Sequence, residues 1–340
     1  MTGINDVAQA VGLSTATVSR ALRGLPGVST ETRQRIEAAA RELHYVPSRA
    51  AAGLASGHTH DIAVLVPYMT RWYFASVTDG AASVLNETGY GMLLYHLAGD
   101  PVARRRLMSG PVLRKRVDAV LLLGLRPTDE EADLLRQTLP VGLVGSQVSG
   151  FPSVSIDDLV AARQATDHLV SLGHTRIGYI GGEALPGYQF ATPRERRRGY
   201  RNGLMAGGLR HDPALETSGQ FTMAGGAAAC GRLLALPDPP TAIFAASDEM
   251  AFGATQMARE RGFSVPGDLS IVGIDDHDMA EHFNLTTVRQ PVVEMGQMAA
   301  RQLLARLGGD TSDSEVVVDT QLVIRGTTAP PAASRLSATS

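Results

Sequence analysis

The stretch AVGLSTATVSRAL, residues 10–22, has the pattern of a sharp turn followed by a short helix. Gly12 stands where a turn between two helices requires a positive φ, which glycine adopts at little cost. Ser14 is a suitable N-cap, because its hydroxyl can accept from the first free backbone N–H groups of the helix that follows. Val18 and Leu22 recur at helical spacing and are expected to face a small core. The pattern predicts a helix-turn-helix.

The opposite face of this predicted helix carries Thr15, Ala16, Ser19 and Arg20. A helix with small polar residues and one arginine on its outer face suits the major groove of DNA, where an arginine can pair bidentately with guanine. An ordinary capped surface helix is the alternative for a stretch of this length. The first 50 residues carry a net charge of +2, from six arginines and four acidic residues, and the rest of the chain carries −5. A basic head on an acidic body is compatible with DNA binding.

Two more predicted helices complete a small head. Asn5 or Asp6 can cap a first helix, and Ser29 can cap a third helix over residues 30–43. We therefore expect a three-helix domain over residues 1–46, with a core sufficient only for docking on a partner.

The junction over residues 47–60 is rich in alanine, glycine and serine. Such a composition is typical of a flexible linker. The alternative is a short helix that forms only on DNA, in which Leu54 enters a minor-groove base step as a wedge. The composition leaves both interpretations open.

After residue 61 the pattern changes to short apolar runs that alternate with helical segments. The runs have strand length and cover residues 62–67, 91–97, 118–124, 140–145, 176–182, 242–247 and 269–275. Uninterrupted apolar strands between amphipathic helices indicate parallel sheets covered on both faces. About 270 residues are too many for one sheet, so we expect two similar lobes, each a doubly wound parallel sheet. Ligands of such folds bind at the carboxyl ends of the strands.

Several classes of protein are disfavoured by the composition. No stretch reaches the ~18 uninterrupted apolar residues of a membrane helix, and we expect no contact with a membrane. The single Cys230 fits a reducing cytosol, so we predict a cytoplasmic location. The histidines lack metal-ligand spacing, and neither a phosphate loop nor a catalytic Ser, His and Asp set stands out. We expect no metal, no cofactor and no enzymatic activity. The arginine-rich runs 104–106 and 114–116 are expected to be solvated helix faces.

Taken together, several motifs resemble those of LacI/GalR-family transcriptional regulators over nearly the whole chain. The matching segments are INDVAQAVGLSTATVSRAL (4–22), VSTETRQRIEAAARELHYVP (28–47), LVSLGHTRIGYIGG (169–182), FAASDEMAFGA (244–254), PGDLSIVGIDD (266–276) and LTTVRQP (285–291). The resemblance implies an all-α helix-turn-helix head joined to a two-lobed, periplasmic-binding-protein-like α/β core. It also implies a homodimer whose affinity for a pseudo-palindromic operator is controlled by a small effector bound between the lobes.

The expected boundaries follow from the resemblance and the apolar pattern together. The head covers residues 1–46, the hinge 47–60 and the effector-binding and dimerisation core 61–330, with a disordered tail over 331–340. Within the core, the N-lobe is expected over about 61–159 and 291–320, and the C-lobe over about 160–290 and 321–330.

The resemblance also implies which residues contact DNA. Thr15, Ala16 and Arg20 would read bases in the major groove, whereas Thr17 and Ser19 would contact phosphate or cap the helix. In the hinge, Arg49 would contact DNA and Leu54 falls where the family inserts a leucine at the operator centre. Ser48, Ala52 and Gly53 depart from the family's more polar and charged hinge pattern, which implies fewer charged anchors.

For the effector site, the resemblance implies aromatic and hydrogen-bonding residues. They are Trp72, Tyr73, Phe74, Phe190, Thr192, Arg196, Phe221, Asp248, Asp275 and Gln290. Aromatic faces stack on sugar rings, and charged side chains bind hydroxyl groups, so a sugar is the expected effector. Phe190 replaces an arginine that holds the base in purine-binding relatives, which disfavours a purine.

Structural roles are the alternative for several of these residues. Phe74 and Phe221 can be core residues, Arg196 can pair with Glu195 or Asp275, and Gln290 can tether the lobes. The favoured function is an allosteric DNA-binding repressor. The alternatives are a soluble sugar- or nucleoside-binding protein and an α/β enzyme that acts on such a ligand.

Overall fold

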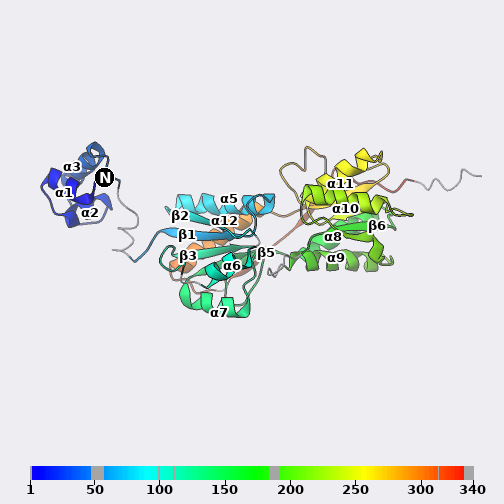
Figure 1. Ribbon diagram of the computed structural model, residues 1–340, viewed down its shortest axis with the longest axis horizontal. Helices are drawn as coiled ribbons and strands as arrows, with labels where there is room; N and C mark the ends of the chain where they lie inside the picture. Colours follow the sequence, from blue (N-terminus) through cyan, green and yellow to red (C-terminus); the bar gives the residue numbers. More distant parts are fainter. Residues whose placement is uncertain are drawn as a thin grey trace, which may run out of the picture. The chain divides into compact units, whose positions relative to one another are not determined.

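The computed structural model describes residues 2–46, 57–98, 100–109, 112–183, 191–312 and 314–332. The chain forms two compact units, Met1–His60 and Asp61–Ser340. The first unit is the helical head, and the second holds two α/β lobes (Figure 1).

The head consists of three helices packed on one small core. They are α1 (Ile4–Val11), α2 (Thr15–Leu22) and α3 (Thr30–Glu42). The buried side chains of this core are Val7, Ala8, Val18, Ala21, Ile36 and Ala40. Each helix contributes two of them, so the three helices stabilise one another and form a helix-turn-helix.

The caps of these helices follow the local sequence. Gly12 ends α1 with φ +68°, and Ser14 accepts a hydrogen bond from the backbone N–H of Thr17 at 3.2 Å, so both predictions are confirmed. The predicted cap of the first helix is wrong. Gly3 is the N-cap, and Asp6 accepts from the Gly3 backbone N–H at 2.7 Å. A carboxylate three residues into a helix can reach back in this way.

The core unit contains two six-stranded sheets with the orders β11-β5-β4-β3-β1-β2 and β12-β10-β9-β8-β6-β7. The N-terminal lobe holds β1 (Asp61–Val66), α5 (Trp72–Glu87), β2 (Gly91–His96), α6 (Pro101–Met108), β3 (Ala119–Leu123), α7 (Asp129–Thr138), β4 (Val141–Val144), β5 (Ser153–Ile156), α12 (Val292–Leu307) and β11 (Glu315–Val318). The C-terminal lobe holds α8 (Asp158–Ser171), β6 (Ile177–Gly181), α9 (Thr192–Ala206), the 3₁₀ turn η1 (Pro213–Leu215), β7 (Glu216–Ser218), α10 (Met223–Leu234), β8 (Ala242–Ala245), α11 (Asp248–Glu260), β9 (Ser270–Asp275), β10 (Thr286–Arg289) and β12 (Gln321–Val323).

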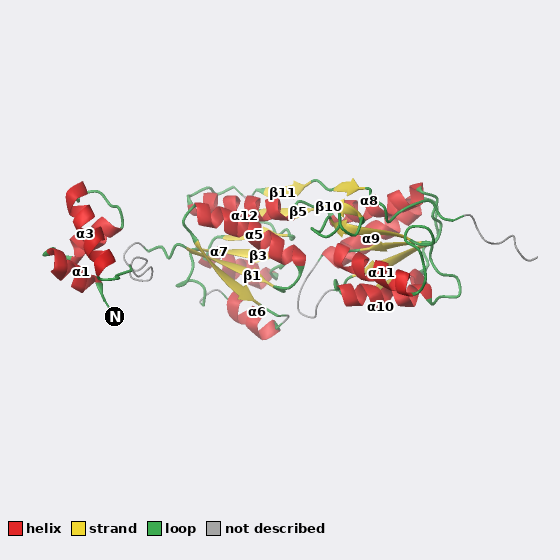
Figure 2. Cartoon of the chain, turned by 90° about the horizontal axis from the view of Figure 1, so that it is seen from above, coloured by secondary structure: helices red, strands yellow, loops and turns green. Residues whose placement is uncertain are grey.

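Helices cover both faces of each sheet. In the N-terminal lobe, α5 and α12 pack on one face, and α6 and α7 on the other (Figure 1). In the C-terminal lobe, α10 and α11 lie opposite α8 and α9, and Figure 2 shows the two lobes from above. The expectation of purely parallel sheets needs one correction. The edge strand β12 pairs antiparallel with β10, because the chain reaches it directly from β11 in the other lobe and not through a crossover helix.

Five strands were not predicted: β5, β7, β10, β11 and β12. They have three or four residues, and their sequences SVSI, ETS, TTVR, EVVV and QLV contain few apolar residues or lie at a sheet edge. Pairing with neighbouring strands of the sheet forms them, and local sequence patterns do not predict such pairing.

One arginine-rich run departs from the expected solvated helix face. Arg104 is 4% exposed, and its guanidinium donates to both carboxylate oxygens of Glu131, at 3.1 and 2.7 Å. It also donates to the carbonyl of Arg126 at 2.8 Å. Arg104 therefore joins α6 to the start of α7, and the expectation of a solvated face is wrong for this residue.

A close approach of two helices joins the middle of α5 to the start of α12. A Cβ atom on Gly80 would meet the backbone carbonyl of Val293, and one on Gly296 would meet that of Val77. Only glycine allows this contact between α5 and α12. Within the described ranges, no helix has the length and apolar character to span a bilayer.

Candidate functional site

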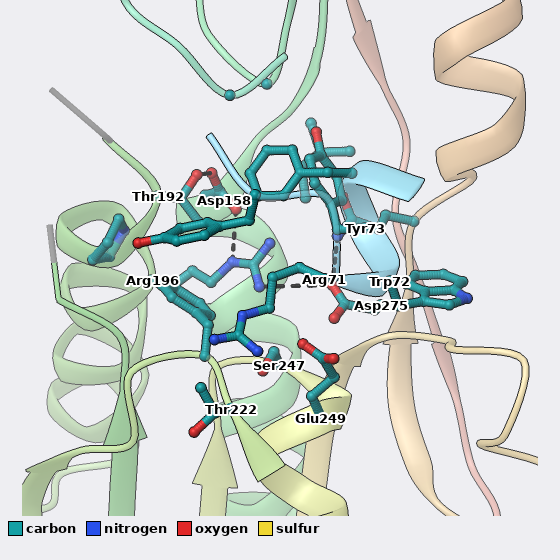
Figure 3. A pocket seen from close by; sticks show the side chains of 18 of the residues that line it. Arg71, Trp72, Tyr73, Asp158, Thr192, Arg196, Thr222, Ser247, Glu249 and Asp275 are labelled. Carbon is teal, nitrogen blue, oxygen red and sulfur yellow. Dashed lines mark hydrogen bonds and ion pairs between the residues drawn. The ribbon is translucent and has the colours of Figure 1, made fainter. Parts of the chain in front are cut away.

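A cavity of about 430 Å³ lies between the two lobes of the core unit. Its walls come largely from segments that follow strands, including Tyr68 after β1, Gly124 after β3, Ser247 after β8 and Asp275 at the end of β9. This is the position at which open α/β sheets bind ligands. Figure 3 shows how side chains from both lobes converge on the cavity.

Most of the residues predicted to bind the effector meet at this cavity. Those that line it are Trp72, Tyr73, Phe74, Thr192, Arg196, Phe221, Asp275 and Gln290. Asp248 does not line it, and Phe190 lies outside the described residues. Segments far apart in the chain thus form one site, as the strand-end argument predicted.

An aromatic wall closes one side of the cavity. The rings of Tyr73 and Phe74 meet edge to face at 5.2 Å, and Tyr68 lies 6.4 Å from Phe74. Phe221 adds a ring from the C-terminal lobe. Burial raises the pKa of Tyr73, so its hydroxyl stays protonated. Phe74 also packs against the core of its lobe, and Phe221 against that of the other, so each combines the structural and the lining role.

Arg196 is the centre of the polar side of the cavity. The side chain is 5% exposed, and its Nε donates to Asp158 at 2.7 Å. Its Nη1 donates to the carbonyl of Ala246 and lies 3.8 Å from Asp275. The Thr192 hydroxyl donates to the other oxygen of Asp158 at 2.7 Å. Arg196 therefore pairs mainly with Asp158, and not with Glu195 as one alternative expected.

Asp275 connects this cluster to Gln290, which lies between strand β10 of the C-terminal lobe and helix α12 of the N-terminal lobe. Gln290 donates to its carboxylate at 2.6 Å, and the backbone N–H of Asp248 donates at 3.4 Å. Burial raises the pKa of Asp275 to about 6, although Arg196 and Gln290 lower it. Asp275 has φ +141°, a strained value for a residue with a side chain. Gln290 therefore lines the cavity and also holds Asp275 at the end of β9.

Asp248 lies behind the cavity wall and is fully buried. It accepts hydrogen bonds from the Thr287 hydroxyl at 2.6 Å and from the His277 backbone N–H at 2.9 Å. Burial and the nearby Asp275 raise its pKa well above the usual range. Asp248 holds β9, β10 and α11 together, and the expectation of a direct ligand contact has no support in this geometry.

Further charged and polar residues line the cavity and were not predicted. They are Arg71, Ser155, Asp158, Glu183, Gln220, Thr222, Ser247 and Glu249. Two of them could have been found from the sequence, because Arg71 directly precedes the aromatic run 72–74 and Glu249 directly follows Asp248. Asp158 follows the unpredicted strand β5 and lacked such a signal.

Trp72 links the two lobes at the edge of the cavity. Its ring stacks on His277 with centroids 4.7 Å apart and planes 26° from parallel. The indole N–H donates to a carboxylate oxygen of Asp278 at 3.0 Å. In Figure 3 the indole lies at the margin of the group, away from Arg196 and Thr192. Trp72, which was expected to contact the effector, thus makes its main contacts with His277 and Asp278 of the other lobe.

In the head, helix α2 presents the residues predicted to contact DNA. Thr15, Ala16 and Arg20 are exposed, and Thr17 and Ser19 are partly buried. Arg49 and Leu54 lie outside the described residues. The exposed side chains are accessible to a partner, although the guanidinium of Arg20 also donates to the carbonyl of Pro26 at 3.4 Å. The Thr17 hydroxyl lies 2.9 Å from that of the N-cap residue Ser14.

Comparisons with known proteins match both units. Residues 3–48 match the family described as "Bacterial regulatory proteins, lacI family", and residues 166–328 match "Periplasmic binding protein-like domain". The chain is 36% identical to the HTH-type transcriptional repressor CytR of Escherichia coli (strain K12) over 332 residues, which cover 96% of both chains. It is 34% identical to the HTH-type transcriptional regulator CelR of Thermobifida fusca, over 94% of this chain and 96% of that one.

Two solved structures resemble the whole chain. The lac repressor dimer bound to operator and the anti-inducer ONPF has a TM-score of 0.85 and 26% identity, covering 96% of this chain and 99% of that one. The complex of the transcriptional regulator CelR with cellobiose has a TM-score of 0.70 and 33% identity, covering 96% and 100%. On the evidence of its helix-turn-helix, its two-lobed core and these relatives, the chain belongs to the lacI family of bacterial regulatory proteins.

Proposed function

We propose that this protein is a transcriptional repressor whose affinity for a DNA operator is controlled by a sugar bound between its lobes. The observation that carries the proposal is the cavity, which combines an aromatic wall with the Arg196, Asp158 and Asp275 cluster. Apolar faces of a sugar ring stack on aromatic side chains, and its hydroxyl groups can donate to carboxylates and accept from a guanidinium. The complex of the relative CelR with cellobiose supports this ligand class.

In this proposal, the head binds the operator. Thr15, Ala16 and Arg20 read bases in the major groove, and Thr17 and Ser19 contact phosphates or cap the helix. In the hinge, Arg49 contacts DNA and Leu54 enters the minor groove. The exposure of α2 supports the first assignment. The domain boundaries are those given above: a head over 1–46, a hinge over 47–60 and a core over 61–330.

A homodimer would hold two heads on a pseudo-palindromic operator. The dimer of the lac repressor on its operator, with a similar fold over 96% of this chain, supports this arrangement. Sugar binding would bias the relative position of the two lobes, and a coupling of about 1.4 kcal/mol is enough to change operator affinity tenfold. A protein with this function acts in the cytoplasm, where the DNA is, and needs no catalysis.

The test combines operator selection with ligand binding on the full chain. Selection from a random duplex library should give a pseudo-palindromic site, and calorimetry with a panel of mono- and disaccharides should identify a ligand that changes the affinity for this site. Arg196→Ala should abolish the response to the sugar and keep DNA binding, whereas Arg198→Ala is the matched control, because Arg198 is exposed and pairs with Glu195. A selection without sequence preference would refute the repressor. Robust turnover of a panel sugar would favour an enzyme.

A further inference from the structure

Two consecutive residues at the end of β9 have an unusual backbone geometry. Asp275 has φ +141° and Asp276 has φ +56°, values that residues with a side chain rarely adopt. A strained backbone of this kind persists only where neighbouring contacts hold it. Asp275 lines the cavity, and Figure 3 shows its carboxylate among the side chains that converge there. The direction of this carboxylate therefore depends on the contacts that hold the turn.

Asp276 supplies most of these contacts. It does not line the cavity, and its side chain is 11% exposed. One carboxylate oxygen accepts from the Nε of Arg289 at 2.6 Å, and the other accepts from the Nη2 of Arg325 at 2.6 Å. The backbone N–H of Asp276 donates to the Thr287 hydroxyl at 3.3 Å. Charge-assisted hydrogen bonds are strong and directional, so both the side chain and the backbone of this residue are fixed.

The first arginine holds the ends of two neighbouring strands together. Arg289 ends β10, where it pairs in register with Asp275 of the parallel strand β9. The next residue, Gln290, donates to the Asp275 carboxylate at 2.6 Å. Two adjacent residues of β10 therefore bind two adjacent residues of β9, and the ion pair of Arg289 with Asp276 supports the alignment that the Gln290 contact requires.

The second arginine is itself firmly held. Arg325 follows β12, and its side chain is 17% exposed. Its Nη1 donates to the carbonyl of Leu285 at 2.8 Å, and its backbone N–H donates to the Thr286 hydroxyl at 3.0 Å. An ion pair with a partner held in this way loses less side-chain entropy than one between mobile surface groups. In the chain, β10 leads into α12 and β12 follows β11, so both arginines lie next to segments that connect the lobes.

We infer that Asp276 is a positioning residue of the effector site: its ion pairs with Arg289 and Arg325 hold the turn that directs the Asp275 carboxylate into the cavity. The inference rests on the proposed function, in which Asp275 accepts a hydrogen bond from a sugar hydroxyl. Asp276 acts through Asp275 and does not touch the ligand. Without the ion pairs the strained turn relaxes, and the Asp275 carboxylate loses its direction although the side chain is still present.

Calorimetry on the full chain with ribose, glucose and cellobiose tests this role in Asp276→Asn. Asparagine tolerates a positive φ as aspartate does, so the variant removes the charge and keeps the backbone preference. Binding should weaken about tenfold or more, as expected when a hydrogen bond to a charged group is lost. Glu216→Gln is the matched control. Glu216 belongs to the same lobe, is also 11% exposed, binds Arg197 and Arg201, and does not line the cavity, so this variant should keep the wild-type affinity.

The pH dependence of binding separates positioning from a general loss of stability. In the wild type, sugar binding should weaken between pH 7 and pH 5, because burial raises the pKa of Asp275 to about 6. In Asp276→Asn, Asp275 no longer meets the sugar, so binding should be weak already at pH 7 and change much less over this range. A mere change in the titration of Asp275 would leave the affinity at pH 7 unchanged. Glu216→Gln should keep the wild-type profile, whatever its thermal unfolding temperature.

Two further variants remove the same contacts in other ways. Arg325→Gln should weaken sugar binding in the same direction, and its combination with Asp276→Asn should add little, because both changes break one ion pair. Asp276→Gly adopts a positive φ at little cost, but it lacks the carboxylate and should also weaken binding. Wild-type affinity in Asp276→Asn or in Asp276→Gly would overturn the inference and leave the sugar-regulated repressor standing. Failure of all three sugars to bind the wild type would overturn the sugar effector and the inference together.

Discussion

The contact of Trp72 with the loop after β9 leads to a quantitative prediction. Asp278→Ala removes the acceptor of the indole N–H, whose hydrogen bond has a length of 3.0 Å, and keeps the stack on His277. A hydrogen bond to a charged group contributes about 1.5–3 kcal/mol when it is well buried. Asp278 is exposed, so we discount the value for solvent screening to about 1 kcal/mol.

A loss of about 1 kcal/mol changes the equilibrium between joined and separated lobes about fivefold. If the joined form binds the sugar, the apparent dissociation constant rises by up to about the same factor, because the fraction of the competent form falls. Asp278→Asn retains an acceptor at the same position and should lose much less. Asp278 itself does not line the cavity, so the variant removes no side chain of the cavity wall.

Trp72 is the single tryptophan of the chain, so its emission reports on this contact directly. In Asp278→Ala, acrylamide should quench the emission more strongly than in the wild type, and added sugar should reduce the difference. Calorimetry on the same samples gives the dissociation constant. Quenching and affinity both equal to those of the wild type would refute the reasoning, since the contact would then contribute nothing to the joining of the lobes.

Three further predictions concern the head and the polar cluster. Arg20→Ala should weaken specific operator binding by about 1–3 kcal/mol and non-specific binding much less, as measured by fluorescence anisotropy; equal losses would contradict base reading. Arg196→Ala leaves buried carboxylates uncompensated and should lower the free energy of unfolding by about 3–5 kcal/mol, whereas Arg198→Ala should change it little in urea titrations. Binding of a neutral sugar should weaken as the pH falls from 7 to 5, because Asp275, with a pKa of about 6, becomes protonated and loses an acceptor; Asp275→Asn should flatten this profile. For stability the sign is opposite: the folded state binds this proton more readily than the unfolded chain, so the contribution of Asp275 to stability increases as the pH falls through about 6.

Several features of this chain follow from local sequence. The turn at Gly12 and the caps at Ser14 and Ser29 depend on residues within three positions of one another, and all three are present in the structure. Six of the seven apolar runs form interior strands of the two sheets, because such runs gain most free energy when both of their faces are buried. The run 91–97 forms the edge strand β2. The resemblance to the family supplied ten expected effector-binding residues, and eight of them line the cavity.

Only the tertiary structure determines that Glu249 lines the cavity and that its neighbour Asp248, which was expected to do so, does not. The two residues are neighbours at the start of α11, about 100° apart around the helix. The packing of α11 against β9 directs Asp248 into the protein, where Thr287 binds it, and leaves Glu249 to line the cavity. Tertiary structure also decides the ion-pair partners of two buried arginines. Asp158, the partner of Arg196, lies 38 positions away in the chain, and Glu131, the partner of Arg104, lies 27 positions away. Periodicity in a sequence specifies which residues a helix or strand can bury, whereas the rotation of that element against its neighbours determines which of two adjacent carboxylates lines the cavity.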